Sequence, residues 1–150
     1  MKRIASFEVD HNTLLPGIYI SRQDGDITTY DIRMRRPNKE PVMANDAIHT
    51  IEHLFATFVR NSASSDKIIY FGPMGCRTGC YFLVRDMPEQ DAIDLIRQAF
   101  AFIAAYEGEI PGASEKECGN WREHSLMGAK QEAKRFLPVI RNWTAERLQY

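Results

Sequence analysis

The residues best suited to chemistry are five consecutive ones, His49-Thr50-Ile51-Glu52-His53, which read H-x-x-E-H. On a helix, Glu52 lies about 60° to one side of His49 and His53 about 40° to the other, so the three side chains share an arc of roughly 100°. Neutral imidazoles suit Zn(II) or Fe(II), and a carboxylate on the same arc can work beside the metal as an acid or base. The pattern therefore predicts a metal site. A histidine pair on a partly polar helix face is the alternative.

A catalytic site of the zinc type usually has three protein ligands and one open position. The candidates for the third ligand are Cys118, His11, His124, Cys76 and Cys80. We favour Cys118, because its setting E-C-G-N is polar and turn-like and lies away from the glycine-rich segment. A small buried residue at a turn is the commoner role of a lone cysteine and stays open. We expect His124 near a helix N-terminus, making structural hydrogen bonds.

Cys76 lies in a second candidate segment, G-P-M-G-C-R-T-G at Gly72 to Gly79. Glycines let backbone N–H groups converge, and Arg77 adds a cation; such surroundings lower the pKa of a thiol. The segment lacks the Lys-Ser or Lys-Thr of a phosphate-binding loop, and Phe82 stands where a cysteine phosphatase has its arginine. Cys76 is therefore either a reactive thiol or an inert residue of a glycine turn. Cys80, which enters an apolar strand, is expected in the core.

The remaining elements must position these groups. Alternating polar and apolar residues up to about Arg36 are interrupted by turn signals at Pro16-Gly17 and Asp24-Gly25-Asp26, which predicts short antiparallel strands. β-Branched and aromatic runs from Ile68 to Phe71 and from Tyr81 to Arg85 predict two more strands, joined by the glycine-rich segment. His11 and Arg33 fall in these strand-like contexts; alone they indicate a structural histidine and a solvated arginine.

Helical spacing of apolar residues predicts three helices. They run from a cap at Asn45 or Asp46 to about Asn61, from Pro88 in the first turn to a stop at Gly108, and from the Cys118-Gly119 turn to Pro138, which ends or kinks the last one. Their apolar stripes should pack on the sheet. The expected fold class is α+β, a single catalytic domain over residues 1–150 with a mainly antiparallel sheet and helices packed on one face.

Composition limits the function further. The chain has 150 residues, 44% hydrophobic and 26% charged, with 19 Lys+Arg against 20 Asp+Glu. A chain of this length buries enough surface to fold without a structural metal, so metal ligands are expected to serve chemistry. The charge balance excludes a strongly basic nucleic-acid binder. Three cysteines without a framework spacing, no secretory signal and no long apolar run predict a protein of the reducing cytoplasm that does not span a membrane.

Read together, these motifs resemble the LuxS family, the bacterial S-ribosylhomocysteine lyases. The resemblance rests on H-T-I-E-H, G-P-M-G-C-R-T-G and E-C-G-N, together with S-F-E-V-D-H-N, D-I-R and R-P-N upstream and H-S-L downstream. The motifs run in the family's order from Ser6 to about Ala133, nearly the whole chain. The resemblance implies cleavage of S-ribosylhomocysteine to homocysteine and 4,5-dihydroxy-2,3-pentanedione, the precursor of the quorum-sensing signal autoinducer-2. It also implies a homodimer with both active sites at the subunit interface.

The resemblance further implies a role for each motif residue. One divalent metal per subunit, natively Fe(II) and alternatively Zn(II) or Co(II), would be held by His49, His53 and Cys118. The acid/base residues would be Cys76 and Glu52. The substrate would be contacted by Ser6, His11 and Arg33. Cys80 matches no motif of the family.

The residue types fit this reaction independently. Moving a ribose carbonyl from C1 to C2 to C3 takes repeated proton transfers beside a carbonyl, which need acid/base groups and a Lewis acid. Two other functions remain open: an inverted-zincin metallopeptidase, for which H-x-x-E-H is also the signature, and a non-catalytic metal-binding module in which Cys76 is inert. Rapid alkylation of Cys76 by iodoacetamide would argue against the binding module.

Overall fold

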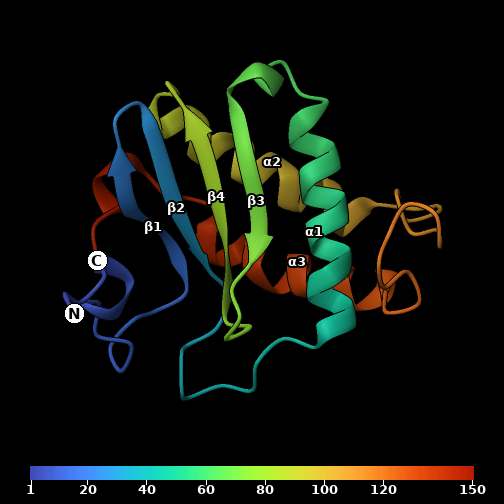
Figure 1. Ribbon diagram of the computed structural model, residues 1–150, viewed down its shortest axis with the longest axis horizontal. Helices are drawn as coiled ribbons and strands as arrows, with labels where there is room; N and C mark the ends of the chain where they lie inside the picture. Colours follow the sequence, from blue (N-terminus) through green and yellow to red (C-terminus); the bar gives the residue numbers. More distant parts are fainter.

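The computed structural model describes the whole chain, Met1–Tyr150, and its centre is one antiparallel sheet. The strands lie in the order β1-β2-β4-β3. Their bounds are β1 Gly17–Asp24, β2 Ile27–Arg33, β3 Ile68–Pro73 and β4 Gly79–Arg85. Helices α1, α2 and α3 gather on one side of this sheet (Figure 1). The predicted α+β class, antiparallel sheet and one-sided helices are confirmed.

The pleat of the sheet assigns neighbouring residues to opposite faces. Tyr30 and Ile32 of β2 pair with Phe82 and Cys80 of β4, and all four are fully buried beneath the helices. Asp31 and Arg33 alternate with them and so lie on the other face. That face therefore carries the polar residues that reach the candidate site.

The helices follow the predicted spacing, with corrections at their ends. Their bounds are α1 Asn45–Arg60, α2 Glu89–Ala105 and α3 Leu126–Ile140. Neither Asn45 nor Asp46 caps α1; the N-cap is Ala44, and Asp46 instead accepts a hydrogen bond from the backbone of Ala47 within the first turn.

The other two helices also differ from the prediction at their boundaries. Pro88 is the N-cap of α2 rather than part of its first turn, and α2 ends before the expected stop at Gly108, because Tyr106 already has extended backbone angles. α3 begins only after Ser125, whose side chain caps it by accepting from the Gly128 N–H. Pro138 does not end α3, since in the last turn the missing N–H removes a single ladder bond.

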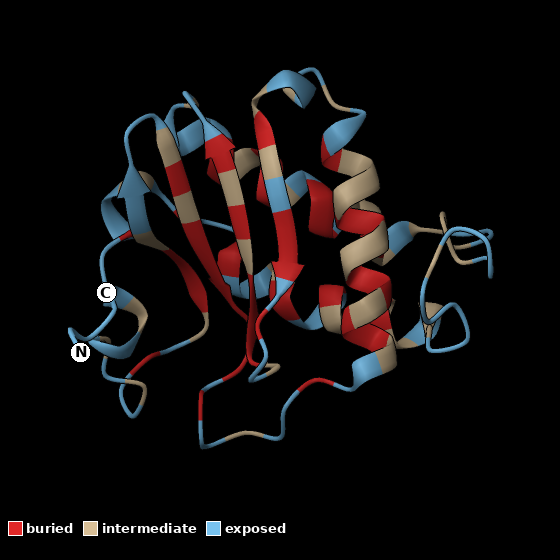
Figure 2. Cartoon of the chain, in the orientation of Figure 1, coloured by how far each residue is buried: buried red, intermediate tan, exposed pale blue.

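An aromatic cluster fixes α1 against the sheet. The Phe55 ring stacks on Phe71 of β3 at 3.8 Å between centroids and meets Phe82 and Phe100 edge-on at 5.1 and 5.6 Å. Buried positions recur along the strands and on the helices packed against them (Figure 2). With Phe55 held in the core, the helix face that carries Glu52 and the two histidines is only half-buried.

Two long connections without helices or strands complete the frame. The first leads from β2 to α1, and the second, residues 106–125, leads from α2 to α3 and carries Cys118. The second connection lies beyond α1 at the edge of the molecule (Figure 1). None of the helices combines the length and the apolar character needed to cross a lipid bilayer.

Candidate functional site

His49, His53 and Cys118 converge at the junction of α1 and the 106–125 connection. The Cys118 Sγ atom lies 3.5 Å from Nε2 of His49 and 3.8 Å from Nε2 of His53. The two imidazole rings are nearly perpendicular, at 85° with centroids 4.8 Å apart. A thiol and two ring nitrogens at such separations form a group that could hold one metal ion.

Backbone carbonyls fix the orientation of both imidazoles. His49 Nδ1 donates to the carbonyl of Glu123 at 2.7 Å, and His53 Nδ1 donates to the carbonyl of Pro111 at 2.8 Å. A carbonyl only accepts, so Nδ1 carries the proton in each ring and Nε2 presents its lone pair toward Cys118. Outer hydrogen bonds of this kind are what hold metal-ligating histidines in place, so the donor set fits a bound metal.

His124 flanks this group. Its Nδ1 lies 2.9 Å from the Thr50 hydroxyl, and its buried Nε2 has no hydrogen-bond partner. Burial, followed by the neighbouring His49 and His53, lowers the pKa of His124 to about 4, so the ring is neutral at physiological pH. Its donor nitrogen lies within 4.8 Å of the other three donor atoms, which places it in the same group.

The ring stacking favours Cys118 over His124 as the third donor of this group. His124 stacks on His49 with centroids 3.9 Å apart and planes inclined by 21°. Imidazole lone pairs lie in the ring plane, so two stacked rings cannot both aim at one ion at the ~2 Å of a metal–nitrogen bond. The geometry favours His49, His53 and Cys118 as the donors, with His124 packed against them.

Cys76 lies at the exposed tip of the turn between β3 and β4. Its sulfur is 3.1 Å from the hydroxyl of Thr78, which in turn accepts a 2.8 Å hydrogen bond from Nη1 of Arg33. Arg77, the cation expected beside Cys76, instead donates to the carbonyl of Met43. The cation linked to the thiol is therefore Arg33, from the neighbouring strand.

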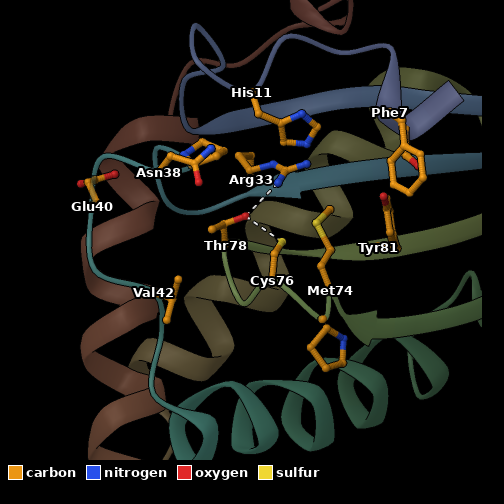
Figure 3. Close-up of a pocket in the computed structure, with 14 residues that line it drawn as sticks. Phe7, His11, Arg33, Asn38, Glu40, Val42, Met74, Cys76, Thr78 and Tyr81 are labelled. Carbon is orange, nitrogen blue, oxygen red and sulfur yellow. Dashed lines mark hydrogen bonds between the residues drawn. The ribbon is translucent and has the colours of Figure 1, made fainter.

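The N-terminal residues complete a cavity around Cys76. Its volume is about 510 Å³, within the usual range for small-molecule sites, and its wall includes Ser6, His11, Arg33 and Cys76 (Figure 3). His11 is held by a 2.8 Å contact from Nδ1 to the carbonyl of Val9. The structure thus brings together four residues that lie in three separate sequence motifs.

The Glu52 side chain lines a different cavity. This second cavity, about 380 Å³, is bordered by Glu52, His53, Arg60 and Tyr70. Within one chain, the two acid/base candidates, Cys76 and Glu52, therefore line different cavities. Of the metal-ligand candidates, His53 lines the cavity of Glu52.

Arg33 is not solvated but buried in an ion pair. Its Nε and Nη2 atoms donate to the two carboxylate oxygens of Asp31 at 3.1 and 2.6 Å, and the Tyr150 hydroxyl donates to the same carboxylate at 2.7 Å. Sequence reasoning missed Asp31, Thr78 and Tyr150. Asp31 could have been predicted as a partner of Arg33, because residues two positions apart on a strand lie on the same face.

Cys80 lies in the core, as predicted. It is fully buried, and burial raises the pKa of its thiol, with the negative charges of Glu52, Asp31 and Cys76 adding to the effect. The thiol is therefore protonated and inaccessible. A chemical role for Cys80 is not supported.

Comparisons with known proteins agree with this set of motifs. The family profile described as S-Ribosylhomocysteinase (LuxS) matches residues 4–147. Curated proteins named S-ribosylhomocysteine lyase are 49% identical in Phocaeicola vulgatus and in Borreliella burgdorferi and 50% identical in Finegoldia magna. Each alignment covers 100% of this chain and 98 to 99% of the relative. The chain belongs to the S-ribosylhomocysteinase (LuxS) family.

Proposed function

We propose that this protein is an S-ribosylhomocysteine lyase, which cleaves S-ribosylhomocysteine to homocysteine and 4,5-dihydroxy-2,3-pentanedione. The observation that carries the proposal is the convergence of His49, His53 and Cys118 at helix α1, which also carries Glu52. Relatives with this name align over 98 to 99% of their length, which supports the same substrate. The second product would supply the autoinducer-2 signal.

The ion would be a single divalent metal per subunit held by His49, His53 and Cys118. Fe(II) is the proposed native metal, and Zn(II) or Co(II) suit the same nitrogen and sulfur donors. When bound, the metal would act as a Lewis acid on the ribose oxygens, which carry negative charge as protons leave the adjacent carbons. The carbonyls of Glu123 and Pro111 keep both imidazoles turned toward it.

Cys76 and Glu52 would divide the proton transfers. The Cys76 thiolate takes and returns protons on the ribose carbons while the carbonyl moves from C1 to C3. Once the carbonyl is at C3, Glu52 removes the acidic proton from C4. The C5–S bond then breaks, a C4–C5 double bond forms, and homocysteine leaves as a thiolate that picks up a proton. The resulting C4 enol gains a proton at C5 and loses its hydroxyl proton, which gives the diketone product.

Ser6, His11 and Arg33 would contact the substrate. They line the cavity of Cys76, and the Val9 contact of His11 leaves its Nε2 free for a ligand. The division of the site between two cavities supports a homodimer in which the active sites lie at the subunit interface. Three apolar side chains of the N-terminal segment are exposed and would be covered by a second copy: Ile4, Phe7 and Leu15.

The decisive experiment incubates the metal-loaded protein with S-ribosylhomocysteine and follows the free thiol of homocysteine with Ellman's reagent, against a blank without substrate. Sugar signals followed by proton NMR in heavy water separate the two acid/base residues. Glu52→Gln should retain metal and exchange sugar hydrogens but release little homocysteine, whereas Cys76→Ala should lose both by about 10²- to 10⁴-fold. Glu107→Gln, at an exposed position outside both cavities, is the matched control.

Three results would count against the proposal. If the metal-loaded wild-type protein released no homocysteine, the proposed lyase activity would be refuted. If Cys76→Ala kept normal exchange and release, the role of the thiol would be wrong. A monomeric mass by light scattering at micromolar concentration, together with full activity, would exclude active sites shared between two subunits.

The proposed location is a reducing cytoplasm, where the thiols of Cys76 and Cys118 stay available.

A further inference from the structure

The hydroxyl of Thr78 is oriented by its neighbours. Arg33 Nη1 lies 2.8 Å from Thr78 Oγ1, and a guanidinium has only donors, so Oγ1 must accept this bond. The hydroxyl hydrogen of Thr78 is thereby left for a different acceptor. The only other side-chain atom within hydrogen-bond distance is the sulfur of Cys76, at 3.1 Å.

Arg33 is held in place from its far side. Two of its nitrogens are bound to the carboxylate of Asp31, which also accepts from Tyr150, so only Nη1 points toward Thr78. Asp31, Arg33 and Thr78 are each at most 4% exposed. Buried side chains with their hydrogen-bonding groups occupied have little freedom to change partners, and the direction of the Thr78 hydroxyl is therefore set by the fold.

We propose that Thr78 is a positioning residue, whose hydroxyl donates a hydrogen bond to the Cys76 thiolate and so holds the sulfur in the cavity in its ionised form. Figure 3 shows the two hydrogen bonds meeting at Thr78, one from Arg33 and one to Cys76. A bond to an ionised sulfur is charge-assisted, whereas a neutral thiol gains no such bond from the hydroxyl. This proposal rests on the proposed proton-transfer role of Cys76.

Thr78 is the only side chain hydrogen-bonded to the Cys76 sulfur. Of the titratable side chains that line the cavity, Glu40 is paired with Arg135, and His11 is bonded to the Val9 carbonyl. The pKa of Tyr81 is raised by burial and by Asp31, so its phenol stays neutral and adds no charge beside the sulfur. Cys80 is buried and protonated. Arg33 forms an ion pair with Asp31, and its hydrogen-bonded connection to the sulfur runs through the Thr78 hydroxyl.

The test is alkylation of Cys76 by iodoacetamide from pH 5 to 9 in Thr78→Val, which keeps the shape of the side chain, and in Thr78→Ser, which keeps the hydroxyl. Trypsin separates the three cysteines, because Cys76 falls in Ile68–Arg77, Cys80 in Thr78–Arg85 and Cys118 in Glu117–Arg122. Thr28→Val is the control, since the Thr28 hydroxyl bonds Gln23, away from the cavity.

We expect Thr78→Val to alkylate at least about tenfold more slowly at pH 7, with the midpoint of its rate–pH curve moved upward, because a hydrogen bond to a charged group is lost. Thr78→Ser should stay within about twofold of wild type, as should Thr28→Val. Thr78→Ala, which removes the hydroxyl without adding bulk, replaces Thr78→Val if circular dichroism shows that the latter does not fold.

A folded Thr78→Val or Thr78→Ala with the wild-type rate and midpoint would overturn the proposal, and so would a Thr78→Ser as slow as Thr78→Val. The alkylation assay uses no substrate. Failure of the wild-type protein to cleave S-ribosylhomocysteine would therefore overturn the proposed function without changing the alkylation result. The two failures are distinguishable.

Discussion

Removal of Asp31 should destabilise the fold more than any surface charge change. The side chains of Arg33 and Asp31 are 4% and 1% exposed, so Asp31→Ala leaves a guanidinium buried with Thr78 as its only partner. Breaking a buried pair from one side costs about 3–5 kcal/mol, and the Tyr150 hydroxyl that loses its acceptor adds about 1 kcal/mol. A domain of this kind is stable by roughly 5–15 kcal/mol in total. The variant should lose at least about a quarter of its free energy of unfolding.

A double-mutant cycle in urea, followed by the fluorescence of the buried Trp143, measures this cost. Arg33→Met alone leaves an uncompensated carboxylate and should also destabilise. Asp31→Ala combined with Arg33→Met removes both charges and should cost clearly less than the sum of the single changes, by about 2–3 kcal/mol of coupling.

The surface pair Arg22–Asp24 supplies the control. Its side chains are 64% and 48% exposed, and Asp24→Ala should change the free energy of unfolding by less than about 1 kcal/mol. The reasoning would be refuted if Asp31→Ala lowered the free energy of unfolding no more than Asp24→Ala. It would also be refuted if the effects of Asp31→Ala and Arg33→Met were additive, because the two side chains would then not stabilise the fold through their ion pair.

Three further predictions concern the metal group and the core. His49→Ala should lose metal by elemental analysis, because one of three donors is gone, whereas His124→Ala should keep a stoichiometric ion; an empty His124→Ala would make the stacked ring a ligand. Native protein treated with iodoacetamide should carry label in the peptide of Cys76 and none in that of Cys80, and early labelling of Cys80 would contradict its burial. Phe55→Ala should lower the free energy of unfolding by about 3–5 kcal/mol in thermal or urea denaturation, and a loss below about 1 kcal/mol would mean that the aromatic cluster relaxes around the gap.

Much of the metal group followed from local geometry. The i, i+4 spacing of His49 and His53 fixes their common helix face whatever the rest of the chain does, and the apolar stripe of α1 predicts which face is buried. Glycine at Gly25, where φ is 59°, marked the β1–β2 turn for a similarly local reason. Patterns of this kind depend on residues a few positions apart.

Other features depend on partners that the pattern does not specify. Arg77 adjoins Cys76 in sequence, yet the cation linked to the thiol is Arg33, because antiparallel pairing brings β2 beside the start of β4. The N-cap of α1 is Ala44, although Asn45 and Asp46 are the better capping residues, because the incoming connection sets where the backbone turns helical. The division of the site residues between two cavities also arises only from the packed structure.

The outer hydrogen bonds of the histidines have a consequence for local unfolding. Cys118 and the carbonyls of Glu123 and Pro111 all belong to the 106–125 connection. An ion bound by Cys118 and the two histidines would therefore link that connection to α1. Local unfolding of the connection breaks the site and loses the free energy of metal binding. The connection should therefore unfold less often as the metal concentration rises. Lys116 and Arg122, exposed on either side of Cys118, are ready sites for trypsin. The survival of this connection against protease in the cell should therefore rise and fall with the metal available to the protein.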